Sequence, residues 1–160
     1  MQTYGDYQAR VRESFLRQAM MRSLGVEIVS IGAGEVVFEM PFGAEFTQQH
    51  GFLHAGAITT VLDSAAGFAA LSVMPEEAGV LTIELKTSLM RVAQAARFRF
   101  CGRVVKAGRS VCFAEAVAYG LEPEGAVEVA RLTASMVAVS GRAGGRGGGA
   151  GGAGRCGGLC

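Results

Sequence analysis

The sequence predicts an α+β fold in which an antiparallel β-sheet wraps around one long central helix. Residues 55–73 form a run of small and apolar residues long enough for a buried helix. Strand-like alternation of apolar and polar residues occurs twice before this run and four times after it. A helix that is apolar on all sides needs cover on all sides, and the surrounding strands can supply it.

Each predicted element follows from a local pattern. Apolar residues recur at helical spacing in the N-terminal segment, and glycine or proline separates the later strands. The expected elements are an N-terminal helix at about 5–23, strands at 26–31 and 35–40, a loop at 44–53, the long helix at 55–73, and strands at 81–90, 98–105, 110–119 and 127–139.

Residues 1–139 are expected to form one domain, followed by a glycine- and arginine-rich tail. The chain has 160 residues, of which 50% are hydrophobic and 18% are charged, so it can build a sizeable core. Residues 140–160 contain 11 glycines without periodicity, and we expect this tail to be disordered, either functional or an artefact.

Charge and cysteine usage narrow the class of protein. The net charge is +1 without a dense basic patch, so no nucleic-acid partner is expected. The first residues lack the apolar region of a signal peptide, and the four cysteines lack metal-ligand spacing. We therefore expect a cytoplasmic protein that neither spans a membrane nor binds a metal, with its cysteines as free thiols.

Asp63 is the residue of the long helix that most suggests chemistry. Histidines aside, it is the only acidic or basic residue between Gln49 and Met74. Burying an unpartnered carboxylate costs several kcal/mol. Small residues, including Gly67, share its stripe of the helix, so a second backbone or a ligand could approach there. Ordinary packing, with Asp63 satisfied by a neighbour, is the alternative.

The loop before the helix carries Gln48 and both histidines, His50 and His54. The helix start at Ala55 offers free N–H groups and a partial positive charge, which can hold a developing oxyanion. A carboxylate two turns further along could face the same space, a combination suited to acyl transfer. The alternative for each histidine is a loop or capping role.

These residues form a recognisable pattern. Gln48-x5-His54-Ala55-Gly56-x6-Asp63, followed by Ser-Ala-Ala-Gly67 and by Thr82-Ile-Glu-Leu-Lys86, resembles the hotdog-fold acyl-CoA thioesterases of the phenylacetate-pathway (PaaI-like) branch. The resemblance covers about residues 20–139. It implies the hotdog fold, an antiparallel sheet around one long helix, in agreement with the element order.

The resemblance also implies roles. Asp63 would be the nucleophile or the general base, and the N–H of Ala55, where the family usually has glycine, would polarise the thioester carbonyl. His54 would shape the loop, Gln48 would lie near the thioester, and Thr82 would help to position water. The site would lie at a dimer interface, with Asp63 and Gln48 from opposite subunits of a dimer or a dimer of dimers. No cofactor is required, because coenzyme A is part of the substrate.

Candidate contacts to coenzyme A are Gly56 at the helix start and Arg91, Lys106 and Arg109 near strand ends, although the basic residues could equally be ordinary surface charges. Residues such as Leu53, Phe68, Leu71 and Met74 would line the acyl pocket. Other candidate functions are a non-catalytic acyl-CoA-binding or regulatory protein and an enoyl-thioester hydratase, whose catalytic motifs are absent here. The identity of the acyl group stays open.

Overall fold

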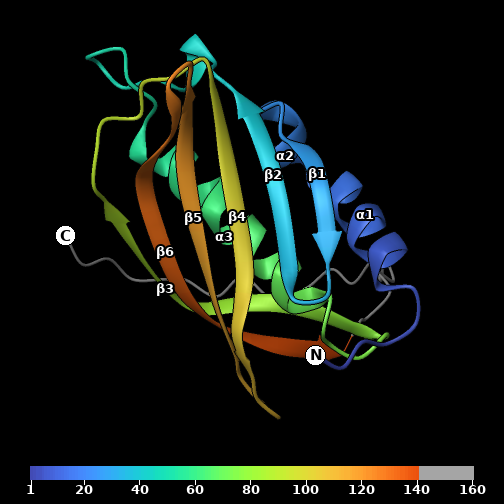
Figure 1. The fold of residues 1–160 in the computed structure, drawn as a ribbon. Coiled ribbons are helices and arrows are strands. Elements are labelled where there is room, and N and C mark those ends of the chain that lie inside the picture. The colour runs from blue at the N-terminus through green and yellow to red at the C-terminus, as the bar shows by residue number, and fades with distance from the viewer. Residues whose placement is uncertain (141–160) are drawn as a thin grey trace, which may run out of the picture.

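A six-stranded antiparallel sheet curves around helix α3 in the computed structural model, which describes residues 1–140 (Figure 1). The strands follow the order β1-β2-β4-β5-β6-β3. They are β1 (Glu27–Gly32), β2 (Glu35–Pro41), β3 (Ala78–Leu89), β4 (Arg97–Ala107), β5 (Cys112–Glu122) and β6 (Gly125–Ser140). The helices are α1 (Tyr7–Arg17), α2 (Ala19–Ser23), the short 3-10 helix η1 (Ala44–Phe46) and α3 (Ala55–Leu71). The predicted α+β class is confirmed.

The predicted N-terminal helix is wrong in one respect, because it is two helices rather than one. Gln18 adopts an extended conformation between α1 and α2. The break redirects the chain so that Met21 and Leu24 are buried in the core. Helical spacing of apolar residues continues through Gln18, so the pattern alone does not reveal the break.

Helix α3 is the centre of the core, with ten of its seventeen residues buried. It packs very closely on β4 at Gly102, where a Cβ atom would lie 2.2 Å from the carbonyl oxygen of Ala65. Only a residue without a side chain permits this approach of helix to sheet. Gly102 thereby fixes the depth at which α3, and any functional group on it, sits in the sheet.

Helix α1 is held on α3 by an aromatic cluster. The ring centroids of Phe15, Phe38 and Phe68, from α1, β2 and α3, lie 5.1–6.0 Å apart in tilted and edge-to-face arrangements. Such pairs stabilise packing by about 0.5–1.5 kcal/mol each beyond the area they bury. Val11, also on α1, is fully buried. The N-terminal segment is therefore an integral part of the core.

Arg10 on α1 caps the C-terminal end of α3. Its guanidinium donates to the carbonyl oxygens of Pro75 at 2.7 Å, Leu71 at 2.6 Å and Met74 at 2.9 Å. A cation there satisfies terminal carbonyls and opposes the negative end of the helix dipole. Burial lowers the pKa of the Arg10 guanidinium, and the nearby Glu76 carboxylate opposes that shift.

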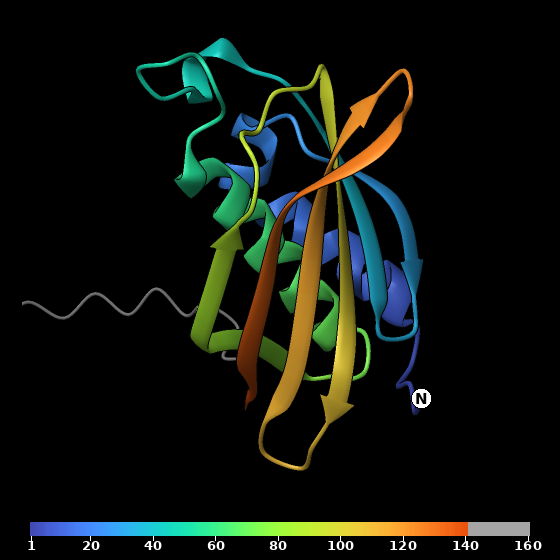
Figure 2. The same ribbon diagram turned by 60° about the vertical axis from the view of Figure 1, so that its left-hand side comes forward.

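The two edges of the sheet differ. Edge strand β1 packs against α1, whereas the opposite edge strand, β3, bends along its length (Figure 2) and has a bulge between Thr82 and Glu84. Apolar side chains of β3 are left uncovered. Leu81, Ile83 and Leu89 are 56%, 59% and 55% exposed. The outer face of the sheet, by contrast, carries cross-strand ion pairs such as Arg99–Glu39 and Arg103–Glu115. Uncovered apolar surface is thus prominent along the free edge of β3.

None of the helices within residues 1–140 combines the length and apolar composition that crossing a bilayer requires. Ser140 is the last residue of β6, and the expected disordered tail otherwise lies outside the described residues. The domain boundary near residue 139 stays a prediction.

Replacing Gly102 by alanine is expected to destabilise the fold by about 1–3 kcal/mol, because the new methyl group overlaps the α3 backbone. Urea unfolding measures the change. Gly32→Ala is the matched control, since its Cβ would meet Glu35 Cβ at an ordinary 3.6 Å, and it should alter stability by less than about 0.5 kcal/mol. Equal losses in the two variants would contradict the close-packing argument.

Candidate functional site

Two of the predicted site residues, Asp63 and Thr82, lie together. Asp63 is half-buried on α3, and the hydroxyl of Thr82 on β3 donates to its Oδ1 at 2.8 Å. Within residues 1–140 no other hydrogen bond reaches the Asp63 carboxylate. One carboxylate oxygen is therefore held in place, while the other is free to act on a substrate or on water.

A cavity of about 550 Å³ adjoins Asp63. It lies between α1, α3 and the first half of β3, which runs across the lower part of the molecule in Figure 1. Predicted pocket residues Phe68 and Leu71 line it. Ser14 and Gln18 line it from the N-terminal segment, and no sequence motif marked these two residues. The cavity size is typical of small-molecule sites.

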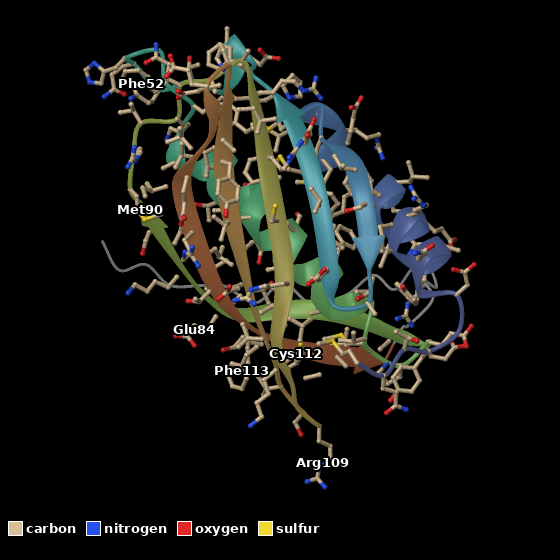
Figure 3. All side chains as sticks on the ribbon, in the orientation of Figure 1. Phe52, Glu84, Met90, Arg109, Cys112 and Phe113 are labelled. Atoms are coloured by element: carbon tan, nitrogen blue, oxygen red, sulfur yellow. The ribbon has the colours of Figure 1, made fainter. Side chains whose placement is uncertain are left out.

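Gln48, Ala55 and Arg91 line a different cavity of about 380 Å³. Phe52 and Met90 also contribute to it, and both lie at the upper left of the molecule in Figure 3. The predicted site residues are thus divided between two cavities of one chain, Asp63 with Thr82 and Ala55 with Gln48.

The loop before α3 is shaped by local hydrogen bonds. Gln48 Oε1 accepts from the N–H of His50, and the Gln48 N–H donates to the Phe52 carbonyl oxygen at 2.9 Å. Gly51 takes a positive φ of 82° in this turn, which glycine adopts without strain. The side-chain NH2 of Gln48 makes no hydrogen bond within the described residues, so it is available to a ligand.

His54 is the N-cap of α3. Its Nδ1 accepts from the N–H of Gly56 at 2.8 Å, which satisfies one of the free amides at the helix start. Within residues 1–140 no acceptor is bonded to the N–H of Ala55. No residue there other than glycine has a positive φ, so alanine occupies this position without backbone strain. The structure therefore presents an open donor at Ala55.

One chain does not bring this donor and the Asp63 carboxylate to the same point. Asp63 lies eight positions after Ala55 along α3, a rise of about 12 Å. Reacting atoms must lie about 3–3.5 Å apart. Within one chain, the Ala55 N–H and the Asp63 carboxylate therefore do not lie side by side, and they line different cavities.

The remaining candidates are spread over the molecule. Gly56 and His54 line a third, shallow cavity beside Met20. Lys106 and Arg109 lie on the β4–β5 hairpin, where Arg109 points away from the body at the bottom of Figure 3, far from Phe52. Of the three basic candidates, only Arg91 lines the cavity of Ala55.

The other two predicted pocket residues do not line the Asp63 cavity. Leu53 lines the cavity of Ala55, and Met74 lines the cavity beneath the β4–β5 hairpin. Cys101 and Cys112 are free thiols, and burial raises the pKa of both. Within residues 1–140 no three His, Cys, Asp or Glu side chains gather at metal-binding distance.

Comparisons with known proteins agree with this geometry. Residues 50–126 match the family model described as the thioesterase superfamily. A thioesterase family protein from Silicibacter pomeroyi, whose crystal structure is known, is 46% identical, with a TM-score of 0.82 over 84% of this chain and 99% of that chain. A Saccharolobus solfataricus protein named "putative esterase" is 31% identical over 96 residues, which are 60% of this chain and 68% of the relative.

The predicted PaaI-like hotdog fold is confirmed as well. The structure of E. coli PaaI, from the phenylacetic acid degradation operon, has a TM-score of 0.75 at 17% identity, covering 84% of this chain and 94% of that chain. The fold, the family match and the similar thioesterase together assign the activity class. The chain belongs to the thioesterase superfamily and is a thioester hydrolase with the hotdog fold.

Proposed function

We propose that this enzyme hydrolyses an acyl-CoA thioester to a free carboxylic acid and coenzyme A at a site shared by two copies of the chain. The observation that carries the proposal is the division of the site. Asp63 with Thr82 and Ala55 with Gln48 lie in separate cavities and about 12 Å apart along α3. Each chain supplies two complementary halves, and each half needs a partner.

The free edge of β3 supports a second copy as that partner. Leu81, Ile83 and Leu85 are exposed in the single chain, on a strand whose outer edge has no neighbour in the sheet. Such an edge invites pairing with another chain. A two-fold axis would bury the same patch on both copies and complete two equivalent sites, whether in a dimer or in a dimer of dimers.

In the proposed site, the partner's Ala55 N–H donates to the thioester carbonyl oxygen and stabilises the oxyanion. As a general base, Asp63 takes a proton from water, the water oxygen adds to the carbonyl carbon, and the C–S bond then breaks. The proton passes to the departing coenzyme A sulfur. As a nucleophile, Asp63 displaces the thiolate directly, forming an anhydride that water hydrolyses. Thr82 orients the carboxylate in either route.

Coenzyme A would extend from the thioester past the partner's helix start. Arg91 lines that cavity, so it is the proposed phosphate contact nearest the reacting bond. Gly56 follows directly in the same helix start. Lys106 and Arg109 remain proposed contacts, although one chain does not place them beside Ala55. An acyl-CoA substrate accords with the cytoplasmic location expected from the sequence.

Asp63→Asn is expected to lower kcat by about 10²–10⁴-fold, because the amide can neither attack nor accept a proton. Release of free thiol from acetyl-, butyryl-, octanoyl- and phenylacetyl-CoA measures the activity. A wild-type protein that releases coenzyme A from none of them would refute the proposed function. An Asp63→Asn protein as active as wild type would refute the role of Asp63 alone.

Ala55→Pro is expected to remove the oxyanion donor while preserving the fold. Proline is favourable at the first helical position, and His54 already has the φ of −63° and ψ of 139° that a following proline requires. We expect kcat to fall about 10²–10³-fold with an unchanged Tm. Full activity with a normal Tm would contradict the oxyanion role.

The same two variants test the shared site. Neither is active alone, but a mixed dimer joins the intact Asp63 of one chain to the intact Ala55 of the other. Random pairing of equal amounts should restore about a quarter of wild-type activity, because half of the dimers are mixed and each has one intact site. No recovery after verified mixing would show that both groups act within one chain.

His54→Ala is expected to destabilise the protein by about 1 kcal/mol through loss of the helix cap. His54→Asn should recover most of this loss, because asparagine is a good N-cap, and should also be the more active of the two. Thermal unfolding and thiol release measure both quantities. If His54→Asn is stable yet as inactive as His54→Ala, the imidazole takes part in the chemistry itself.

A further inference from the structure

We propose that the cavity between α1, α3 and β3 receives the acyl group, and that Gly67 and Ser14 on its opposite walls set the size of acyl group accepted. This inference rests on the proposed function and adds the specificity of its site. The cavity of about 550 Å³ adjoins Asp63 and extends past Gly67 and Phe68 to Leu71. An acyl chain bound at Asp63 can therefore continue along α3, away from the helix start.

Gly67 lies one turn beyond Asp63 and lines the cavity. Its φ is not positive, so the backbone does not require glycine. A Cβ added there would meet only Met136 Cε, at 3.9 Å, which is an ordinary contact. Packing does not require glycine either, in contrast to Gly102. Glycine is nevertheless a poor residue for the interior of a helix, and its presence leaves space in the cavity beside Asp63 that a larger side chain would occupy.

The opposite wall is α1, which is fixed rather than hinged. Phe15 packs in the aromatic cluster, Arg10 binds three carbonyl oxygens at the end of α3, and Gln18 Oε1 accepts from Ser64 Oγ at 3.3 Å. These contacts hold Ser14, which is half-buried on the cavity side of α1. Because the wall cannot swing away, the space between Ser14 and Gly67 limits the bound group.

This wall lies outside the part of the chain that matches the family model, which begins at residue 50. The catalytic half of the cavity, with Asp63 and Thr82, lies within the matched residues. The acyl-binding wall is thus supplied by a different segment from the catalytic residues. Changes in α1 can alter acyl selectivity without altering the groups that act on the thioester.

The test compares wild type with Gly67→Leu and Ser14→Leu on acetyl-, octanoyl- and phenylacetyl-CoA. Either substitution fills the cavity, so the ratio of kcat/KM for octanoyl- or phenylacetyl-CoA to that for acetyl-CoA should fall at least about tenfold, as for a pocket shortened by one or two methylene groups. Arg12→Leu is the matched control, because Arg12 is exposed on α1 and does not line the cavity; its ratio should stay that of wild type.

Gly67→Ala tests whether the fold itself requires glycine at this position. It should raise Tm by about 2–4 °C, since alanine favours helix and meets no neighbour too closely. A fall in Tm would show that Gly67 is needed for packing, and it would overturn the inference. An unchanged ratio in Gly67→Leu and Ser14→Leu, or an equal loss on all substrates, would also overturn it.

Binding measurements with thioethers that cannot be hydrolysed test this inference independently of the proposed function. Affinities for ethyl- and octyl-CoA thioethers, which resist hydrolysis, should show the same loss of preference for the longer chain in Gly67→Leu and Ser14→Leu. If wild type hydrolyses no thioester, the proposed function fails, and the thioether affinities still decide whether this cavity holds the chain. Unchanged affinities in both variants would reject the cavity as the acyl pocket whatever the activity.

Discussion

The rigid geometry of α3 is the constraint on which the organisation of this enzyme depends. One helix carries both the open N–H of Ala55 and the carboxylate of Asp63, and its rise keeps them about 12 Å apart. Rotation of the Asp63 side chain does not close that gap, because an aspartate side chain is much shorter than about 12 Å. In the proposed function the two groups meet at one thioester by pairing helices from two chains, so catalysis and assembly are a single requirement.

The packing around α3 holds the helix in place and so keeps Ala55 and Asp63 apart. Gly102 lets the sheet approach the helix backbone, the aromatic cluster of Phe15, Phe38 and Phe68 holds α1 on it, and Arg10 closes its C-terminal end. A helix held on so many sides cannot readily bend or unwind to bring its own groups together. Movement of α3 within one chain is therefore a poor way to complete the site. The uncovered edge of β3, by contrast, gives a second chain an exposed surface on which to pack without any change in the fold.

The sequence predicts much of this fold because the strongest patterns are local. The run of small and apolar residues gives α3 within two residues of its observed end, and alternation gives all six strands. Thr82 was named as a site residue only through the family resemblance, and its hydrogen bond to Asp63 was not predicted. The break at Gln18 was missed because helical spacing continues through it. The distance of Arg109 from Arg91 and the place of Ser14 in the cavity were not predictable, because both depend on how distant segments pack.

Two glycines, Gly102 on β4 facing α3 and Gly67 within α3, show how structural and functional constraint can be told apart. At Gly102 a Cβ would overlap the helix backbone, so packing alone explains glycine. At Gly67 an added Cβ would have room, and any residue can adopt the backbone conformation. The position lies in a helix interior, where alanine is more favourable than glycine. A residue that is unfavourable for its element and unneeded by its neighbours points to whatever occupies the space beside it. Here that space adjoins Asp63, which is why the proposal assigns Gly67, and not Gly102, a role in substrate selectivity.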